Sequence, residues 1–344
     1  MFERIRSSRM KFPAFRMGAP RNGRVEPPLT VDVTLPNEEL RETSFGPDVE
    51  GSETRPDSAG RTGIGLPPPG SIGVILVNAN RISIADARRI TAAQRETGEP
   101  FGETAIRMGL ATVTDIQFAL SRQFALPCLQ EGDNAIDPEV IAAFHPGNEL
   151  VELLRNLRGQ IATRALEGSP PLRCIAIVGA DPRIGRSFVT ANLATVFAQL
   201  GARTLLVDAD LVRPRQHLLF RLENRSGLSS ILAKRAGLDA VCLVAGLPGL
   251  AVLPAGPLPP NPHDLLARPM FGQLLRRCER DFHVILIDTP TWSEDRSARM
   301  IAATAGAGVL LVQSGRTGAA DANEVVQELA QVGSKLLGVV LNRP

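Results

Sequence analysis

The sequence predicts an α/β fold in which a mainly parallel sheet is flanked by helices, preceded by a small helical repeat domain and a disordered N-terminal arm. Short apolar runs at 174–178, 204–207 and 284–287 have the composition of buried strands, and two of them end directly in aspartate. A longer segment at 188–201 separates the first run from the second and has helical composition. Strands that alternate with helical segments are typical of a parallel sheet with crossover helices.

The overall composition excludes several classes of partner. The 344 residues carry 38 basic and 36 acidic side chains, so a net charge of +2 gives no strong attraction to nucleic acid or to a membrane surface. The four cysteines form no C-x-x-C pair, which argues against a zinc site or a disulfide framework. No run approaches the roughly 18 apolar residues of a membrane span, and the first residues lack a signal-peptide core. We therefore expect a soluble, cytoplasmic protein without a nucleic-acid partner.

Three regions are expected along the chain. Residues 1–69 are rich in proline, glycine and charged side chains without apolar periodicity, which predicts a disordered arm. Residues 70–145 contain an internal repeat, in which Ser83 is equivalent to Thr112 and Asp86 to Asp115. Residues 146–344 form the predicted α/β domain, which contains the candidate site residues.

Each copy of the repeat predicts a short helix, a turn and a second, amphipathic helix. The first helix should end near Asn80 in one copy and near Gly109 in the other. Ser83 and Thr112 are then in position to cap the second helix, because their hydroxyl groups can accept a backbone N–H of its first turn. Two such units could stack into one small core.

The repeat resembles the N-terminal domain of type II secretion and type IV pilus ATPases, where tandem copies of the motif can bind cyclic di-GMP. In that family the nucleotide-binding form opens with Arg-Leu-Gly, whereas this sequence has Ser71-Ile72-Gly73 and Pro100-Phe101-Gly102. An arginine guanidinium stacks on guanine and pairs with phosphate, so its replacement in both copies removes the main polar contact. The resemblance therefore implies a docking module more than a cyclic di-GMP site.

A glycine-containing loop follows the first predicted strand. Gly185, Arg186 and Ser187 stand where the general phosphate-binding signature has Gly-Lys-Ser/Thr, and Gly179 begins the loop. Backbone amides at the start of the next helix would face an anion, and the Ser187 hydroxyl could complete a magnesium shell. The predicted nucleotide contacts are Gly179, Asp181, Pro182, Arg183, Ile184, Gly185, Arg186, Ser187 and Phe188.

Two loop residues depart from the general signature of such phosphate-binding loops. Arg186 replaces the usual lysine, which keeps the charge but brings a larger planar head. Arg183 occupies a position that is usually glycine. A short glycine-containing turn before a helix is by itself a common structural joint, so the residues around the loop decide its interpretation.

Carboxylates follow the other two predicted strands of this domain. Asp208 and Asp210 come after one strand, and Asp288 ends the other. The carboxyl ends of parallel strands meet at one edge of the sheet, where open α/β folds bind their ligands. Because Mg²⁺ prefers hard oxygen ligands and retains waters, Ser187, Asp208 and Asp288 are the predicted metal ligands. The structural alternative is that each aspartate only caps backbone groups at the end of its strand. That role would explain one of the three aspartates but hardly all of them.

Several longer motifs lie between about Glu149 and Pro344. They are the loop ending GRS, the DADL segment continuing into RPRQHLLF, the stretch VLPAGPLPPNPHDLLARP, the strand end IDTP and the final LGVVLNRP. Together they resemble the bacterial tyrosine kinases of capsule and exopolysaccharide synthesis, a P-loop NTPase family. The combination with the helical repeat and with Arg186 is similar to a subgroup of these autokinases that accompanies an exosortase system.

This resemblance implies transfer of the γ-phosphoryl group of ATP to a tyrosine hydroxyl, with Mg²⁺ and Arg186 neutralising the developing charge. Asp208 or Asp210 would accept the hydroxyl proton, and Asp288 would complete the catalytic set. Asn342 matches an asparagine that contacts adenine in related P-loop ATPases, and its amide offers both a donor and an acceptor. The implied cofactors are thus ATP and Mg²⁺.

The same resemblance implies an assembled complex. Glu152, Arg155 and Arg158 match the motif through which these kinases form rings, and their spacing places them on one helical face. A solvated charge pair is the alternative interpretation of that spacing. The expected partner is a membrane chain-length-determinant protein, or polysaccharide co-polymerase, which would recruit the kinase to the inner face of the cell membrane.

Two departures from the family leave the activity open. The family usually autophosphorylates a C-terminal tyrosine cluster, whereas these 344 residues contain no tyrosine, and Val212 replaces an arginine that commonly follows the paired aspartates. Three hypotheses remain: a kinase acting on another protein, a nucleotide-dependent switch or scaffold without phosphotransfer, and a partition or positioning ATPase. The third ranks last because Asp181 stands where partition ATPases have a second lysine.

Overall fold

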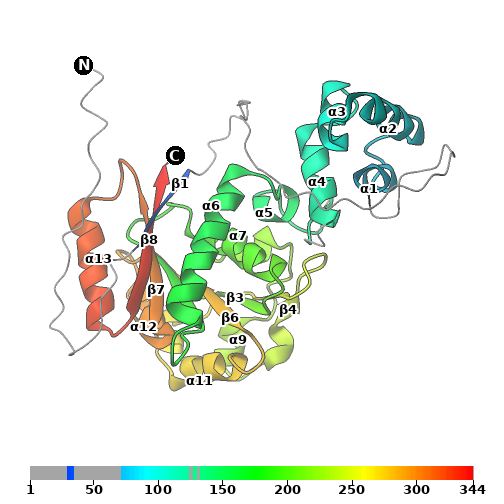
Figure 1. Cartoon of the computed structure of the whole chain (residues 1–344). Coiled ribbons are helices and arrows are strands. Elements are labelled where there is room, and N and C mark those ends of the chain that lie inside the picture. The colour runs from blue at the N-terminus through cyan, green and yellow to red at the C-terminus, as the bar shows by residue number, and fades with distance from the viewer. Residues whose placement is uncertain (1–28, 35–70, 124–126, 130–131, 344) are drawn as a thin grey trace, which may run out of the picture. The chain divides into compact units, whose positions relative to one another are not determined.

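The computed structural model describes residues 29–34, 71–123, 127–129 and 132–343. These residues form two compact units, one made of helices between 71 and 123 and one built around a sheet (Figure 1). The sheet unit takes in residues 29–34, 127–129 and 132–343, so it includes residues before 146, where the sequence placed the boundary. The reason is packing: Asn192 and Gln199 of the sheet unit make buried hydrogen bonds to the backbone of Ala142.

The helical unit has the repeated form that the sequence predicts. Its helices are α1 (Ile72–Asn78), α2 (Ile84–Thr97), α3 (Phe101–Arg107) and α4 (Val113–Gln123). Asn80 and Gly109 follow the short helices with left-handed φ values of 55° and 66°. The hydroxyl groups of Ser83 and Thr112 accept the backbone N–H of the residue three positions on, at 3.0 and 3.1 Å. Each copy is therefore a helical hairpin with the same turn and the same cap.

An ion pair joins the two copies of the repeat. Arg81 of the first copy donates from Nη1 to Asp115 Oδ1 of the second at 2.7 Å, and both side chains are mostly buried. The guanidinium also lies over the Phe118 ring, 4.8 Å from its centroid. The small core below consists of the buried side chains Leu76, Ile82, Ala87, Ile90, Ala105, Ile116 and Ala119.

Within the described residues the sheet has eight strands, in the order β1-β8-β7-β2-β6-β3-β5-β4. They are β1 (Leu29–Thr34), β2 (Cys174–Gly179), β3 (Thr204–Asp208), β4 (Cys242–Leu243), β5 (Leu250–Leu253), β6 (Val284–Asp288), β7 (Ala307–Gln313) and β8 (Lys335–Arg343). All neighbours pair in parallel except β4 with β5. The mainly parallel sheet predicted from the sequence is confirmed.

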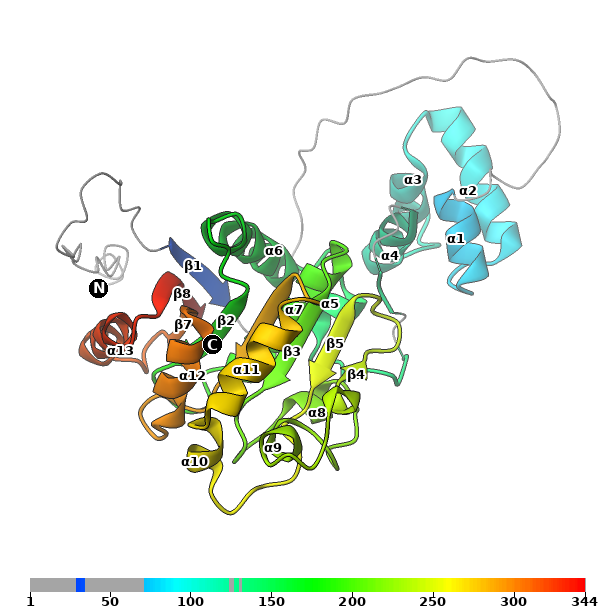
Figure 2. The ribbon, with the colours of Figure 1, turned by 90° about the horizontal axis from the view of Figure 1, so that it is seen from below.

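Helices cover both faces of the sheet, which Figure 2 shows from a second direction. One face carries α5 (Ile141–Phe144), α6 (Glu149–Ile161), α7 (Arg186–Gln199) and α8 (Gln216–Leu219). The other carries α9 (Leu228–Leu232), α10 (Pro262–Leu266), α11 (Pro269–Cys278), α12 (Ser297–Ala305) and α13 (Ala319–Gln331). Successive residues of the central strands enter the two cores in turn, as Ile175 and Ala176 do in β2. Within the described ranges, none of the helices combines the length and apolar character needed to cross a bilayer.

Strand β1 corrects part of the prediction for the N-terminal arm. Residues 29–34 were expected to be disordered, but they pair in parallel with β8 in the register Leu29↔Gly338 to Thr34↔Arg343. The segment LTVDVT does alternate apolar and polar residues, as a strand would. Its pairing partner is β8, which lies far away in the sequence, so the neighbouring residues gave no sign of the pairing. The rest of the predicted arm, 1–28 and 35–69, lies outside the described residues.

Candidate functional site

The glycine loop lies where β2 ends and α7 begins, at the carboxyl edge of the sheet. Gly185 is the N-cap of α7 with a left-handed φ of 91°. A Cβ on Gly179 would lie 2.7 Å from Ile184 Cδ1 and 2.8 Å from Arg186 Cδ, so the loop folds back onto the end of β2. Arg183 also has a left-handed backbone, with φ 58°, which is costly for a residue with a side chain. The loop thus has the tight turn that the signature requires, with arginine at a strained position.

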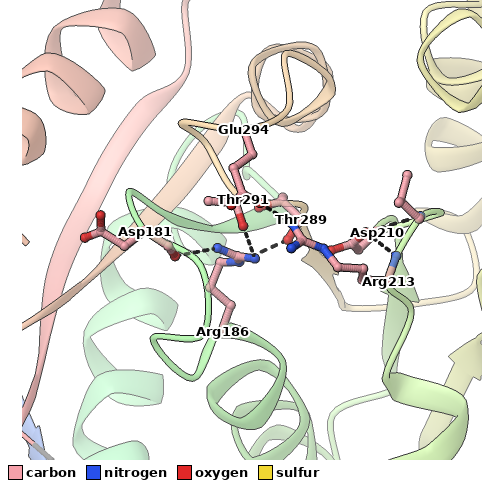
Figure 3. A network of polar contacts seen from close by, with 8 residues as sticks. Asp181, Arg186, Asp210, Arg213, Thr289, Thr291 and Glu294 are labelled. Carbon is pink, nitrogen blue, oxygen red and sulfur yellow. Dashed lines mark hydrogen bonds and ion pairs between the residues drawn. The ribbon is translucent and has the colours of Figure 1, made fainter. Parts of the chain in front are cut away.

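The Arg186 guanidinium binds protein acceptors around the loop (Figure 3). Nε donates to Thr289 O at 3.1 Å, Nη1 to Asp181 O at 3.0 Å and Nη2 to Thr291 Oγ1 at 3.0 Å. Burial lowers the pKa of Arg186, while the nearby carboxylates of Asp288 and Asp210 act in the opposite direction. Each of Nη1 and Nη2 has a second N–H that these bonds do not use, so the guanidinium could still contact a phosphate.

Two buried carboxylates face each other beside the loop. Asp208 and Asp288 are direct partners in the register of β3 and β6, and they are 0% and 1% exposed. Asp208 Oδ2 accepts the backbone N–H groups of Arg215 at 3.0 Å and Gln216 at 2.9 Å. Asp288 Oδ2 accepts the side-chain Nε2 of Gln216 at 2.7 Å. The second oxygen of each aspartate, Oδ1, is buried without a hydrogen-bond partner.

The electrostatics of this pair call for a cation. Burial, followed by repulsion from Asp288, raises the pKa of Asp208 well above its usual range. Burial also raises the pKa of Asp288, although hydrogen bonds from Gln216 and the Ser187 hydroxyl and the charge of Arg186 oppose the shift. Two adjacent buried carboxylates cannot both ionise cheaply unless positive charge compensates them.

The donor set fits magnesium. The Ser187 hydroxyl lies close enough to Asp288 to lower the pKa of that aspartate, and the two free Oδ1 atoms are hard oxygen ligands without a donor. Across the described residues there is no group of three or more His, Cys, Asp or Glu side chains arranged to hold a metal. This composition suits Mg²⁺, which binds proteins through one or two carboxylates and takes its remaining ligands from phosphate and water.

Asp210 occupies the turn that follows β3. Its Oδ1 accepts the backbone N–H groups of Val212 at 3.2 Å and Arg213 at 2.8 Å, and the residue is 7% exposed. Arg213 itself forms an ion pair with Glu294 from the loop after β6, and this contact raises the pKa of Arg213. Val212 is exposed, so the position where the family commonly has arginine carries an apolar side chain facing solvent.

Asn342 and Asp181 hold the glycine loop from the β7–β8 side. Asn342 is 3% exposed, and its Nδ2 donates to Ile184 O at 3.1 Å. Asp181 Oδ2 accepts the hydroxyl of Thr317 at 2.6 Å. Both residues thus have a structural role in fixing the loop, and the adenine contact of Asn342 stays a prediction.

The predicted assembly motif lies on α6, but its three side chains have different surroundings. Glu152 and Arg155 form an ion pair, with Glu152 exposed. Arg158 instead donates from Nη1 to Val196 O at 2.7 Å, and burial lowers its pKa. Because the last carbonyls of a helix have no partner within it, Arg158 completes the C-terminal end of α7. Ring assembly through this motif remains a prediction.

Three residues of the site could not be found from the sequence. Gln216 bridges the two aspartates, and Thr289 and Thr291 provide acceptors for Arg186. Gln216 and Thr289 lie inside the matched motifs RPRQHLLF and IDTP, and Thr291 directly follows the second motif. Each of them contacts a residue that lies far away in the sequence, so the spacing of residues could not predict these contacts.

The loop at the start of α7, with Asp208 and Asp288 on adjacent strands, defines a phosphate-binding protein of the P-loop class. No protein-family model matches the sequence. Among curated proteins, the tyrosine-protein kinase YwqD of Bacillus subtilis is 34% identical over 203 residues, which are 59% of this chain and 85% of YwqD. The chain therefore belongs to the family of bacterial tyrosine-protein kinases.

Solved structures agree with this assignment. The crystal structure of the chimerical protein CapA2B2 superposes with a TM-score of 0.56 at 30% identity, covering 66% of this chain and 98% of that one. The kinase domain of the Escherichia coli tyrosine kinase ETK gives a TM-score of 0.56 at 32% identity, covering 59% of this chain and 79% of that one. The fold class inferred from the sequence is thereby confirmed.

Proposed function

We propose that this chain is an ATP- and Mg²⁺-dependent protein tyrosine kinase that phosphorylates another protein and regulates the chain length and export of an exopolysaccharide. The observation that carries the proposal is the pair of free buried oxygens, Asp208 Oδ1 and Asp288 Oδ1, beside the glycine loop. Buried acceptors without a donor are costly, and a nucleotide-bound cation would compensate both. Family membership supports tyrosine as the acceptor.

The loop would bind the phosphates of ATP. Backbone N–H groups at the N-terminus of α7 and the two unused N–H bonds of Arg186 provide donors for anionic oxygens. Ser187, Asp208 and Asp288 would hold Mg²⁺, which would neutralise charge on the β- and γ-phosphates. The loop contacts from Asn342 and Thr317 keep this cradle in place.

The reaction would transfer the γ-phosphoryl group in line. The bond from the γ-phosphorus to the bridging oxygen breaks as a bond to the tyrosine oxygen forms, and ADP leaves. Of the two candidate bases we favour Asp210 as the acceptor of the tyrosine proton. It is 7% exposed, against 0% for Asp208, and only its Oδ1 is held by backbone N–H groups of the turn.

The phosphoacceptor would lie outside these 344 residues, because they contain no tyrosine, and we propose that it belongs to another protein. We propose a membrane chain-length-determinant protein as the partner that brings the kinase to the inner face of the membrane, with its cytoplasmic tail docked beside the nucleotide. Co-purification of the two from cells that is lost on Arg186→Ala would support this partner. Absence of association with ATP present would count against it.

The enzymatic proposal is tested by label transfer. The protein would be incubated with Mg²⁺, γ-labelled ATP and a tyrosine-containing polypeptide, beside Asp210→Asn and Asp288→Asn. We expect label on tyrosine for the native chain, at least about 100-fold less with Asp210→Asn and loss with Asp288→Asn. No transfer by the native chain with any tyrosine polypeptide or with the purified partner would contradict the kinase assignment.

One observation favours a second function, a nucleotide-dependent switch without phosphotransfer. Arg186 makes three hydrogen bonds to the protein, so ATP would have to share or replace partners that are already satisfied. Such a site could bind ATP and change loop conformation without stabilising the transition state. Tight binding of ATP measured by calorimetry, together with no label transfer in the experiment above, would support the switch.

A further inference from the structure

Gln216, the first residue of α8, connects the three segments of the site. Its backbone N–H donates to Asp208 Oδ2 at 2.9 Å. Its side-chain Nε2 donates to Asp288 Oδ2 at 2.7 Å and to Ser187 O at 3.1 Å. The residue is completely buried. One side chain thus contacts β6 and the glycine loop while the same residue's backbone holds the end of β3.

The acceptors determine how the side-chain amide is oriented. A carboxylate oxygen and a carbonyl oxygen both need a donor, so only the NH₂ end of the Gln216 amide can face them. The other end, Oε1, is buried without a partner, as are Oδ1 of Asp208 and Oδ1 of Asp288. The side-chain amide of Gln216 therefore fixes Oδ2 of Asp288, and its backbone N–H fixes Oδ2 of Asp208. The other oxygen of each aspartate, Oδ1, stays available as an acceptor.

A carboxylate held at one oxygen has a defined orientation, and its second oxygen is presented in one direction. Groups that orient metal ligands in this way typically change metal affinity by about 10- to 100-fold when they are removed. Gln216 holds both aspartates and also the backbone of Ser187, whose hydroxyl is the third candidate ligand. The three ligands come from separate segments, and contacts of Gln216 join them.

We propose that Gln216 is a positioning residue for the metal that accompanies bound ATP, an inference that rests on the function proposed above. It is not itself a ligand. It keeps Ser187, Asp208 and Asp288 in one arrangement, so that a hydrated divalent cation meets all three at once. Gln216 should therefore control how much Mg²⁺ strengthens ATP binding, and should affect the affinity for metal-free ATP much less.

The test measures that coupling directly. ATP affinity is determined by calorimetry with Mg²⁺ and again with EDTA, and the ratio of the two dissociation constants is the coupling factor. Gln216→Met keeps the length of the side chain and the backbone N–H but removes the amide donor. We expect the coupling factor to fall by about tenfold or more, with the dissociation constant in EDTA changed by less than about threefold.

Gln199 offers a matched control on α7. Its Nε2, like that of Gln216, donates to two acceptors, here the backbone carbonyls of Pro127 at 2.9 Å and Ala142 at 2.7 Å, and its Oε1 is also buried without a partner. Its acceptors, on Pro127 and Ala142, belong to the packing of these segments against α7 and not to the metal site. Gln199→Met should lower the melting temperature and leave the coupling factor unchanged.

Each outcome decides the inference. An unchanged coupling factor in Gln216→Met, or an equal fall in Gln199→Met, would overturn the positioning role while leaving ATP binding intact. If the native chain binds no ATP with or without Mg²⁺, the proposed function fails and this inference fails with it. Should Gln216→Met not fold, Gln216→Asn replaces it, because its shorter polar side chain cannot hold both Asp288 and Ser187.

Discussion

Arg186 Nη2 donates to Thr291 Oγ1 at 3.0 Å, which ties the glycine loop to the segment that follows β6. Thr291 is fully buried and lies three residues beyond Asp288. The same guanidinium reaches Thr289 O and Asp181 O. A lysine has a single ammonium group and no fork of donors, so it could not bridge these positions in the same geometry. The three acceptors around this loop position are therefore placed for an arginine and not for a lysine.

Removal of the Thr291 hydroxyl should weaken ATP binding without abolishing it. Thr291→Val keeps the shape but leaves one N–H of Arg186 without its acceptor, a loss of about 1 kcal/mol, or roughly fivefold in affinity. Arg186→Lys should cost about as much or more, since it removes two further contacts. Calorimetric titration with Mg·ATP measures both. Tighter binding in both variants would mean that these contacts compete with ATP.

Asp208→Asn should stabilise the protein in the absence of ATP and Mg²⁺. The change replaces a carboxyl group whose ionisation is opposed by burial and by Asp288 with a neutral amide that can donate to Asp288, while the amide oxygen keeps the backbone N–H groups of Arg215 and Gln216. We expect a gain of about 1 kcal/mol at neutral pH, or about 2–4 °C in melting temperature. Thermal melts followed by circular dichroism check this. A lower melting temperature would show that the two charges are already compensated.

The same carboxylate gives the metal-free protein a definite pH dependence. The pKa of Asp208 is 3.8 when unperturbed and well above that in the folded state, because burial and Asp288 favour its neutral form. The folded state thus binds more protons than the unfolded state, and stability from this group is lost as pH rises through its folded pKa. The free energy of unfolding should fall as pH rises from about 4 towards neutrality. Urea titrations across that range should show a shallower decline for Asp208→Asn.

Arg183→Gly tests the strain in the loop. Arg183 is exposed and has φ 58°, a conformation that costs roughly 1 kcal/mol for residues with a side chain. Glycine removes that cost but gains freedom in the unfolded chain, so we expect a small net stabilisation of about 0.5 kcal/mol. Arg276→Gly is the control, because Arg276 is exposed inside the helix α11, where a change to glycine should destabilise the protein by about 1 kcal/mol. Urea denaturation that gives both variants the same loss would contradict the strain argument.

Variants of the α6 motif separate assembly from folding. Glu152→Ala removes an exposed ion pair that contributes about 0–1 kcal/mol, so its melting temperature should hardly change. Arg158→Ala leaves Val196 O without its donor and should cost about 1–2 kcal/mol. If the motif mediates ring formation, sedimentation should show smaller assemblies for Glu152→Ala at unchanged stability. An unchanged sedimentation coefficient for Glu152→Ala would mean that the motif has no role in assembly and serves only the folding of α6.

Local patterns predicted local structure well. The turns at Asn80 and Gly109 and the caps at Ser83 and Thr112 follow from neighbouring residues, so the repeat could be inferred from the sequence alone. Features set by distant contacts could not. Strand β1 exists through pairing with β8, and the segment around Ala142 belongs with the sheet because side chains of α7 hold its backbone.

The candidate site divides in the same way. Asp208 and Asp288 were predictable because carboxylates at the ends of parallel strands meet at one edge, and their register in the structure is direct. The role of Gln216 was not, because it depends on a helix start that brings one amide against two strands and a loop. Asn342 matched a family position, yet its side chain also holds the Ile184 carbonyl of the loop, which no motif indicated.

The central claim is that the glycine loop and the two strand-end aspartates form a Mg·ATP site. Calorimetric titration of the native chain and of Asp288→Asn with ATP, each with Mg²⁺ and with EDTA, tests it most directly. We expect the native chain to bind ATP at least about tenfold more tightly with Mg²⁺, and Asp288→Asn to lose that difference. Failure of the native chain to bind ATP, or equal Mg²⁺ dependence in both proteins, would contradict the account.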